Sequence, residues 1–142
     1  MQELKDRIVK EGKVLPGNII KVDGFLNHRI DTELMDHIAE EFGKHFNMDE
    51  VTMILTAEAS GIALSAIVAH HFHKPMIFAK KAKSDNIEGG LYQSDIFSYT
   101  YKKKVTLLVS KEWLSADDKV LIIDDFMANG EAMRGLCDIV DA

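Results

Sequence analysis

Residues 120–132 read VLIIDDFMANGEA, and this stretch indicates both the fold class and the place of a candidate site. Its four leading apolar residues are typical of a strand that is buried on both faces. Asp124 and Asp125 follow at the end of that strand. The small or turn-forming residues that come next are Ala128, Asn129 and Gly130. The stretch therefore predicts a buried strand, an acidic strand end and a tight turn into a helix.

Each part of this stretch suits one group of a sugar phosphate. Carboxylates at a strand end can accept hydrogen bonds from vicinal sugar hydroxyls. Asn129 and Gly130 tolerate positive φ, which lets the backbone curl around an anion. The free N–H groups at the start of a helix attract a phosphate. The combination predicts a ribose 5-phosphate site, although each part has a plainer alternative, since paired aspartates can be solvated caps and Gly130 can be a simple turn.

The middle of the chain predicts parallel strands. Residues 51–56 and 76–79 are apolar runs of strand length, and residues 62–72 between them read as a helix. Strand, helix and strand in this order imply a right-handed crossover and a parallel sheet, hence an α/β fold. Ligands bind at the carboxyl ends of such strands, so residues 56–61 are expected to lie near the acidic stretch.

The flanking segments complete the expected domain, a single one over 1–142. An opening helix with Leu4, Ile8 and Val9 on one face should stop at Gly12. Asp31 is expected to cap a second helix, whose apolar residues are Leu34, Met35, Ile38, Ala39, Phe42 and Phe46.

Three further predictions concern the second half of the chain. Residues 80–93 read as a long polar loop, a candidate lid. Residues 96–101 and 105–109 should form a hairpin. A helix over 132–140 should direct Met133, Leu136, Cys137 and Val140 inward.

Composition limits the kind of partner. The chain has 142 residues, 46% hydrophobic and 28% charged, with a net charge of −6, which is globular and argues against a nucleic-acid partner. Its one cysteine, Cys137, allows no internal disulfide. The charged N-terminus and the lack of a long apolar run predict a cytoplasmic protein that does not enter a membrane. His70, His71 and His73 are not expected to form a metal site, because they cannot all face one ion from a helix.

Residues 120–132 resemble the phosphoribosyl pyrophosphate motif of the type I phosphoribosyltransferases. The Ala-Asn-Gly variant is similar to that of the bacterial xanthine enzymes within this family. Residues 21–31 resemble the family's N-terminal segment, 56–62 its pyrophosphate loop, and 78–81 with Ser84 the start of its flexible loop. The resemblance implies a mostly parallel sheet flanked by helices, with a small N-terminal hood and a flexible loop.

The resemblance also implies roles for individual residues. Those that would cradle the 5-phosphate are Ala128, Asn129, Gly130, Glu131 and Ala132. Asp124 and Asp125 would hold the ribose hydroxyls, and Mg²⁺ would be shared between the sugar and the pyrophosphate. Ile20 would pack against the purine, and Asn27 would form a hydrogen bond with it. The family usually has Leu at the position of Ile20, and Gln where Glu131 stands, so this carboxylate should point away from the phosphate.

The activity implied is transfer of the 5-phosphoribosyl group from phosphoribosyl pyrophosphate to xanthine, giving xanthosine 5′-monophosphate and diphosphate, in a homodimer. Relatives continue beyond the length of this chain with strands and a base-contacting lysine, so the C-terminal part of the family fold is expected to be absent. Two alternatives stay open. One is a non-catalytic domain that senses phosphoribosyl pyrophosphate, as in purine repressors, and the other is a truncated, inactive relative.

Overall fold

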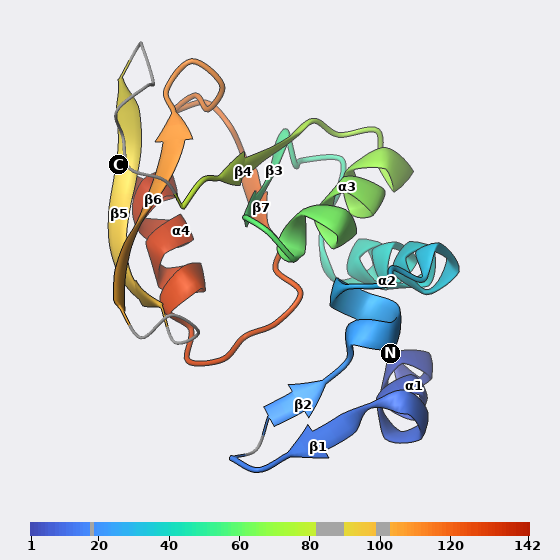
Figure 1. Ribbon diagram of the computed structural model, residues 1–142. Coiled ribbons are helices and arrows are strands. Elements are labelled where there is room, and N and C mark those ends of the chain that lie inside the picture. Colours follow the sequence, from blue (N-terminus) through green and yellow to red (C-terminus); the bar gives the residue numbers. More distant parts are fainter. Residues whose placement is uncertain (18, 82–89, 99–102) are drawn as a thin grey trace.

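The computed structural model describes residues 1–17, 19–81, 90–98 and 103–142 (Figure 1). The elements in chain order are α1 (Gln2–Glu11), β1 (Lys13–Leu15), β2 (Ile19–Lys21), a π-helical turn η1 (Asp23–Asn27), α2 (Thr32–His45), β3 (Met53–Ala57), α3 (Gly61–His71), β4 (Met76–Ala79), β5 (Leu91–Ser98), β6 (Lys103–Ser110), β7 (Val120–Ile122) and α4 (Glu131–Asp141). Within the described ranges, no helix has the length and apolar character that crossing a bilayer requires.

The central sheet has the order β4-β3-β7, and all three strands are parallel. Leu55 of β3 lies opposite Ile77 of β4 on one side and Ile122 of β7 on the other. This confirms the predicted α/β fold with a parallel sheet. Because the strands run the same way, the segments that follow β3, β4 and β7 all leave from one edge of the sheet.

The antiparallel hairpin β5–β6 extends this sheet through a single bridge. The Lys80 N–H donates to the Leu108 carbonyl at 2.9 Å, and the Leu108 N–H donates back at 3.0 Å. Strand β5 starts at Leu91. The end of the predicted loop over 80–93 therefore belongs to β5, and the strand predicted over 96–101 begins earlier than expected. Strand β5 starts early because it pairs with β6 from Leu91, which lies opposite Ser110. The polarity of these residues does not reveal this pairing. Residues 82–89, with Ser84, and residues 99–101 lie outside the described part of the chain.

Two apolar cores occupy the two faces of the central sheet. Alternate residues of a strand point to opposite faces, so Ile54 packs with α2 and α3 while Leu55 packs with α4 and the hairpin. Leu121 and Ile123 join the first core, and Ala79 joins the second. Figure 1 shows α2 and α3 on one side of β3 and β7, with α4 and the β5–β6 hairpin on the other.

The predicted stop of the first helix and start of the second are confirmed, but Phe46, expected on the apolar face of the second helix, lies just past the end of α2 and is 46% exposed. The N–H of Gly12 bonds to the Ile8 carbonyl at 2.8 Å where α1 stops. Asp31 caps α2, with its carboxylate accepting the Leu34 N–H at 3.2 Å. Val9 was wrongly expected on the buried face, because it is 85% exposed while Ile8 carries the packing against the core.

The buried face of α4 differs from the predicted one. Leu136 is buried as expected, but Cys137 and Val140 are exposed, and Gly135 and Ile139 are buried in their place. Gly135 explains the rotation of the helix. A Cβ atom there would overlap Ile96 Cγ2 and lie 3.0 Å from Leu107 Cδ1, so the bare glycine backbone lets α4 lie close against the hairpin.

Gly135→Ala is therefore expected to destabilise the protein, although alanine favours helices. Forcing a methyl group against the branched Ile96 side chain costs about 1–3 kcal/mol, and the helix-propensity gain of about 1 kcal/mol offsets part of this cost. We expect a net loss of up to about 2 kcal/mol in the free energy of unfolding by urea denaturation. Cys137→Ala, at an exposed position of the same helix, is the control and should change it by less than about 0.5 kcal/mol. A Gly135→Ala variant more stable than wild type would contradict this packing.

Candidate functional site

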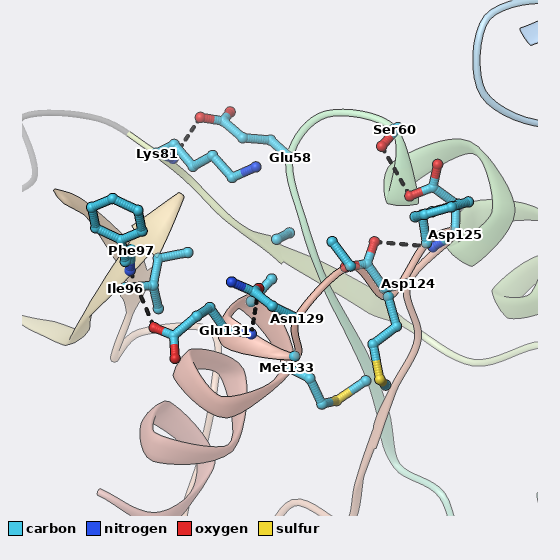
Figure 2. A pocket seen from close by; sticks show the side chains of 16 residues that line it. Glu58, Ser60, Lys81, Ile96, Phe97, Asp124, Asp125, Asn129, Glu131 and Met133 are labelled. Atoms are coloured by element: carbon cyan, nitrogen blue, oxygen red, sulfur yellow. Dashed lines mark hydrogen bonds between the residues drawn. The ribbon is translucent and has the colours of Figure 1, made fainter. Parts of the chain in front are cut away.

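A cavity of about 280 Å³ lies at the edge of the sheet from which β3, β4 and β7 send their following segments (Figure 2). Its walls come from four places, which are the end of β3 with the residues that follow it, Lys81 after β4, Ile96 and Phe97 of β5, and the acidic loop with the first turn of α4. The lining residues from the acidic loop and helix are Asp124, Asp125, Phe126, Met127, Ala128, Asn129, Gly130, Glu131, Ala132 and Met133. The two loops that the sequence singled out therefore meet in one cavity, as predicted.

The two aspartates are joined to each other and to the β3 loop. The Asp125 N–H donates to Asp124 Oδ1 at 3.0 Å. The Ser60 hydroxyl donates to Asp125 Oδ1 at 2.9 Å, across the sheet edge (Figure 2). Asp125 Oδ2 is buried and makes no hydrogen bond within the described chain. Asp125 is thus tied to the β3 loop through one carboxylate oxygen, while the other has no polar partner in the described chain.

Gly61 allows this close approach of the two loops. A Cβ atom there would overlap Thr56 Oγ1 and would lie 2.8 Å from Asp124 Oδ1. The start of α3 can therefore lie against the end of β7 only because residue 61 has no side chain. Thr56 was grouped with the pyrophosphate loop by resemblance, but its side chain is fully buried, and the residues of that loop that line the cavity are Ala57, Glu58 and Ser60.

Asp124 titrates far from its usual range. Burial raises its pKa from 3.8 to about 6, and the side chain of Asp125 acts in the same direction through hydrogen bonding and its negative charge, while the bond from the Asp125 backbone N–H lowers the pKa. The positive charge of Lys81 opposes this shift. Two close carboxylates held out of water resist double ionisation, so a partner that supplies positive charge or hydrogen-bond donors would stabilise them. Perturbed carboxyl groups in a cavity are typical of a functional site.

The turn before α4 has the geometry that its sequence predicted. Gly130 has φ +80°, in the left-handed region, with open space around its Cα, so the backbone conformation rather than crowding requires glycine. Its carbonyl accepts the first helical bond, from the Arg134 N–H at 2.9 Å. Asn129 Oδ1 accepts the Glu131 N–H at 3.3 Å. The first turn of α4 thus lines the cavity, and backbone N–H groups at the start of a helix can bind an anion.

The Glu131 side chain turns away from this N-terminus, toward β5. Its Oε2 accepts the Phe97 N–H at 3.2 Å (Figure 2). The same oxygen accepts an Arg134 side-chain N–H at 3.2 Å. The neighbouring guanidinium and the Phe97 N–H hold the pKa of Glu131 below its usual value. This orientation agrees with the expectation that a carboxylate at this position must point away from a bound phosphate.

The opposite wall carries the polar residues Glu58 and Lys81. The Lys81 N–H donates to the Glu58 carboxylate, which joins the segments after β3 and β4. The peptide bond between Glu58 and Ala59 is cis. The described lining residues include the carboxylates of Glu58, Asp124, Asp125 and Glu131 but only one lysine, Lys81. No group of three or more histidine, cysteine, aspartate or glutamate side chains that could hold a metal ion occurs in the described ranges.

The structure does not bring the two expected base-contacting residues to this cavity. Ile20 lies on β2, 40% exposed, and Asn27 ends the turn η1, and neither lines the cavity. Figure 1 shows the β1–β2 hairpin well away from α4. Conversely, Ile96 and Phe97 line the cavity and were not singled out from the sequence, because only the fold of β5 against α4 carries them there.

Comparison with known proteins agrees with this arrangement. Residues 25–142 match the family model described as the phosphoribosyl transferase domain. A xanthine phosphoribosyltransferase of Lachnoclostridium phytofermentans is 54% identical over 140 residues, 99% of this chain and 72% of the relative. Another, from Bifidobacterium animalis subsp. lactis, is 48% identical over 143 residues, 100% of this chain and 74% of the relative.

Solved structures share the fold at lower sequence identity. The APRTase of Giardia lamblia, complexed with 9-deazaadenine, superposes with a TM-score of 0.78 at 22% identity, over 97% of this chain and 76% of that one. The adenine phosphoribosyltransferase of Saccharomyces cerevisiae gives 0.76 at 15% identity, over 99% of this chain and 82% of that one. With its parallel sheet, its acidic strand end and its match over residues 25–142, this chain belongs to the phosphoribosyltransferase family and has the type I fold.

Proposed function

We propose that this protein is a purine salvage enzyme that transfers the 5-phosphoribosyl group from phosphoribosyl pyrophosphate to xanthine. The products would be xanthosine 5′-monophosphate and diphosphate. Xanthine is named by the relatives at 54% and 48% identity, which cover nearly the whole of this chain. One observation carries the proposal. The acidic strand end, the α4 N-terminus and the β3 loop line one cavity, where sugar hydroxyls, a 5-phosphate and a pyrophosphate can be bound together.

In this proposal each part of the cavity binds one part of the substrate. The turn at 128–132 would cradle the 5-phosphate with backbone N–H groups. Asp124 and Asp125 would accept hydrogen bonds from the ribose hydroxyls. Glu58 and Ser60, at the end of β3, lie where the pyrophosphate would leave. The sugar is thereby held between its two phosphate ends, which directs its anomeric carbon to the incoming base.

The reaction needs no protein nucleophile. Displacement at the anomeric carbon passes through a state that resembles an oxocarbenium ion, as in glycoside chemistry. The chain would act by aligning the base nitrogen with the departing pyrophosphate and by presenting backbone donors to the charge that develops there. Phe126 and Met127, exposed apolar side chains in the cavity wall, would help to exclude water.

The donor set fits Mg²⁺, which is a hard cation that prefers oxygen ligands. Asp125 Oδ2 is buried and makes no hydrogen bond within the described chain, and Asp124 lies beside it. The excess of carboxylates among the lining residues also favours a cation that accompanies the anionic substrate. Bound Mg²⁺ would neutralise charge on the departing pyrophosphate.

Several finer assignments stay predictions. Ile20 and Asn27 are proposed to contact the purine. Since both lie outside the cavity, this requires β2 and the η1 turn that follows it to reach the base when substrate is bound. A homodimer, a cytoplasmic location and a single domain over 1–142 are proposed on resemblance and composition. The proposed lid over 80–93 falls largely on residues outside the described ranges.

The proposal is tested by binding and turnover with the full chain. Calorimetric titration with phosphoribosyl pyrophosphate and Mg²⁺ should give a one-site isotherm, and adding xanthine should then produce xanthosine 5′-monophosphate and diphosphate. Guanine, hypoxanthine and adenine are the comparison bases and should react more slowly. Binding without turnover of any base would reject the enzyme and favour a sensing domain.

Replacing both aspartates should abolish substrate binding. Asp124→Ala with Asp125→Ala removes the hydroxyl acceptors and the oxygen ligands for the cation, so we expect phosphoribosyl pyrophosphate affinity to fall at least about 100-fold by calorimetry. The matched control replaces two exposed aspartates, Asp49 and Asp141, by alanine and should bind within about twofold of wild type. Retention of affinity in the Asp124/Asp125 variant would show that the site lies elsewhere.

Substrate binding should weaken in acid because Asp124 must be ionised to accept both hydroxyl donors and a cation. Its pKa is raised to about 6, so its carboxylate is protonated below that pH and ionised above it. We expect kcat/KM for phosphoribosyl pyrophosphate to fall about tenfold for each pH unit below this value. The substrate phosphate also titrates, so the pH profile is compared with that of Asp124→Asn, which retains only the substrate's contribution. Identical profiles for the two proteins would exclude Asp124 as the titrating group.

A further inference from the structure

Arg134 lies one turn into α4 and joins that helix to β5. One guanidinium nitrogen, Nη2, donates to Glu131 Oε2 at 3.2 Å and to the Asp95 carbonyl at 2.8 Å. The other, Nη1, donates to Asp138 Oδ2 at 2.6 Å. The buried Ser94 hydroxyl donates to that same Asp138 oxygen at 2.8 Å. The Arg134 guanidinium is thus bonded to Glu131 and Asp138 of its own helix and to Asp95 of β5.

Glu131 lies where its charge would affect a phosphate bound in the cavity. It is the first residue of α4 and follows Gly130, so its backbone belongs to the turn that would bind a phosphate. Its carboxylate is one-third exposed, in the cavity wall next to Phe97 (Figure 2). A free negative charge here would repel a bound phosphate, and it could also compete for the backbone donors of the turn.

We propose that Arg134 is a positioning residue that neutralises Glu131 and holds its carboxylate against β5, leaving the α4 N-terminus open to the substrate's phosphate. This inference rests on the proposed function, since it concerns the same phosphate site. Arg134 acts through Glu131 and touches no substrate itself. Its second set of bonds, to Asp95 and Asp138, keeps the guanidinium in place when the cavity fills.

A purely structural role for Arg134 makes a different prediction. If Arg134 only tied α4 to β5, its removal would loosen the phosphate turn whatever residue stood at 131. If it serves to neutralise Glu131, removal of the Glu131 charge should repair the damage. The double variant Glu131→Gln/Arg134→Met therefore separates the two roles, because glutamine keeps the length and the acceptor atom that Phe97 uses but loses the charge.

The experiment measures binding of ribose 5-phosphate, and of phosphoribosyl pyrophosphate with Mg²⁺, by calorimetry, together with KM for both substrates. Arg134→Met should weaken both ligands about tenfold and raise KM for phosphoribosyl pyrophosphate by a similar factor, with less effect on KM for the base. The double variant should recover most of this loss. The single variant Glu131→Gln measures how ligand affinity changes when Glu131 loses its charge while Arg134 is kept.

Arg7→Met is the matched control. Arg7 also pairs with two carboxylates, Glu11 at 2.7 Å and Asp31 at 2.9 Å, but it lies on α1 and lines no part of the cavity. It should leave affinity for ribose 5-phosphate within about twofold of wild type. Thermal unfolding of each variant checks that the fold persists at the assay temperature.

The possible results are distinct. Recovery in the double variant supports the positioning role. Wild-type affinity in Arg134→Met, or a double variant no better than Arg134→Met, would overturn the inference and leave the proposed function standing. Failure of the wild type to bind either ligand would overturn the proposed function and this inference with it.

Discussion

Strands β3 and β7 pair in parallel with Leu55 opposite Ile122, and the candidate site depends on this contact. Parallel pairing sends the segments after both strands to one edge of the sheet, although they are some 65 residues apart in sequence. Gly61 then lets the start of α3 approach the Asp124 carboxylate, and the Ser60 hydroxyl reaches Asp125. A side chain at residue 61 would separate the two loops and open the cavity between them.

The site combines an acidic wall with a ligand that is expected to be anionic. Three features reconcile these charges. The turn at Gly130 offers backbone donors rather than side chains. The partly buried carboxylates of Asp124 and Asp125 lie side by side and would favour a cation that arrives with the substrate. Glu131 is paired with Arg134 and turned toward β5. A net charge of −6 is therefore compatible with phosphate binding, because the local arrangement of donors and charges matters more than the total.

The local features of the sequence were read correctly where they depend on neighbouring residues. The Asp31 cap, the stop at Gly12 and the turn at Gly130 are properties of a few consecutive residues, and all are present. The predictions were wrong where tertiary packing determines which face of a helix is buried or where a strand begins to pair. Cys137 was expected inside, but α4 is rotated because Gly135 fits against Ile96. The start of β5 at Leu91 was missed because its ladder with β6 is a contact between distant residues.

By itself the sequence determined the α/β class, the acidic strand end and the tight turn at Gly130 into α4, because strand burial, positive φ and helix starts leave local signatures in residue type. Only the tertiary structure decided which residues meet around the cavity. Phe97 and Arg134 have no motif of their own, and they flank Glu131 because the hairpin folds back onto α4. Burial likewise raises the pKa of Asp124, a property of its surroundings rather than of its place in the chain.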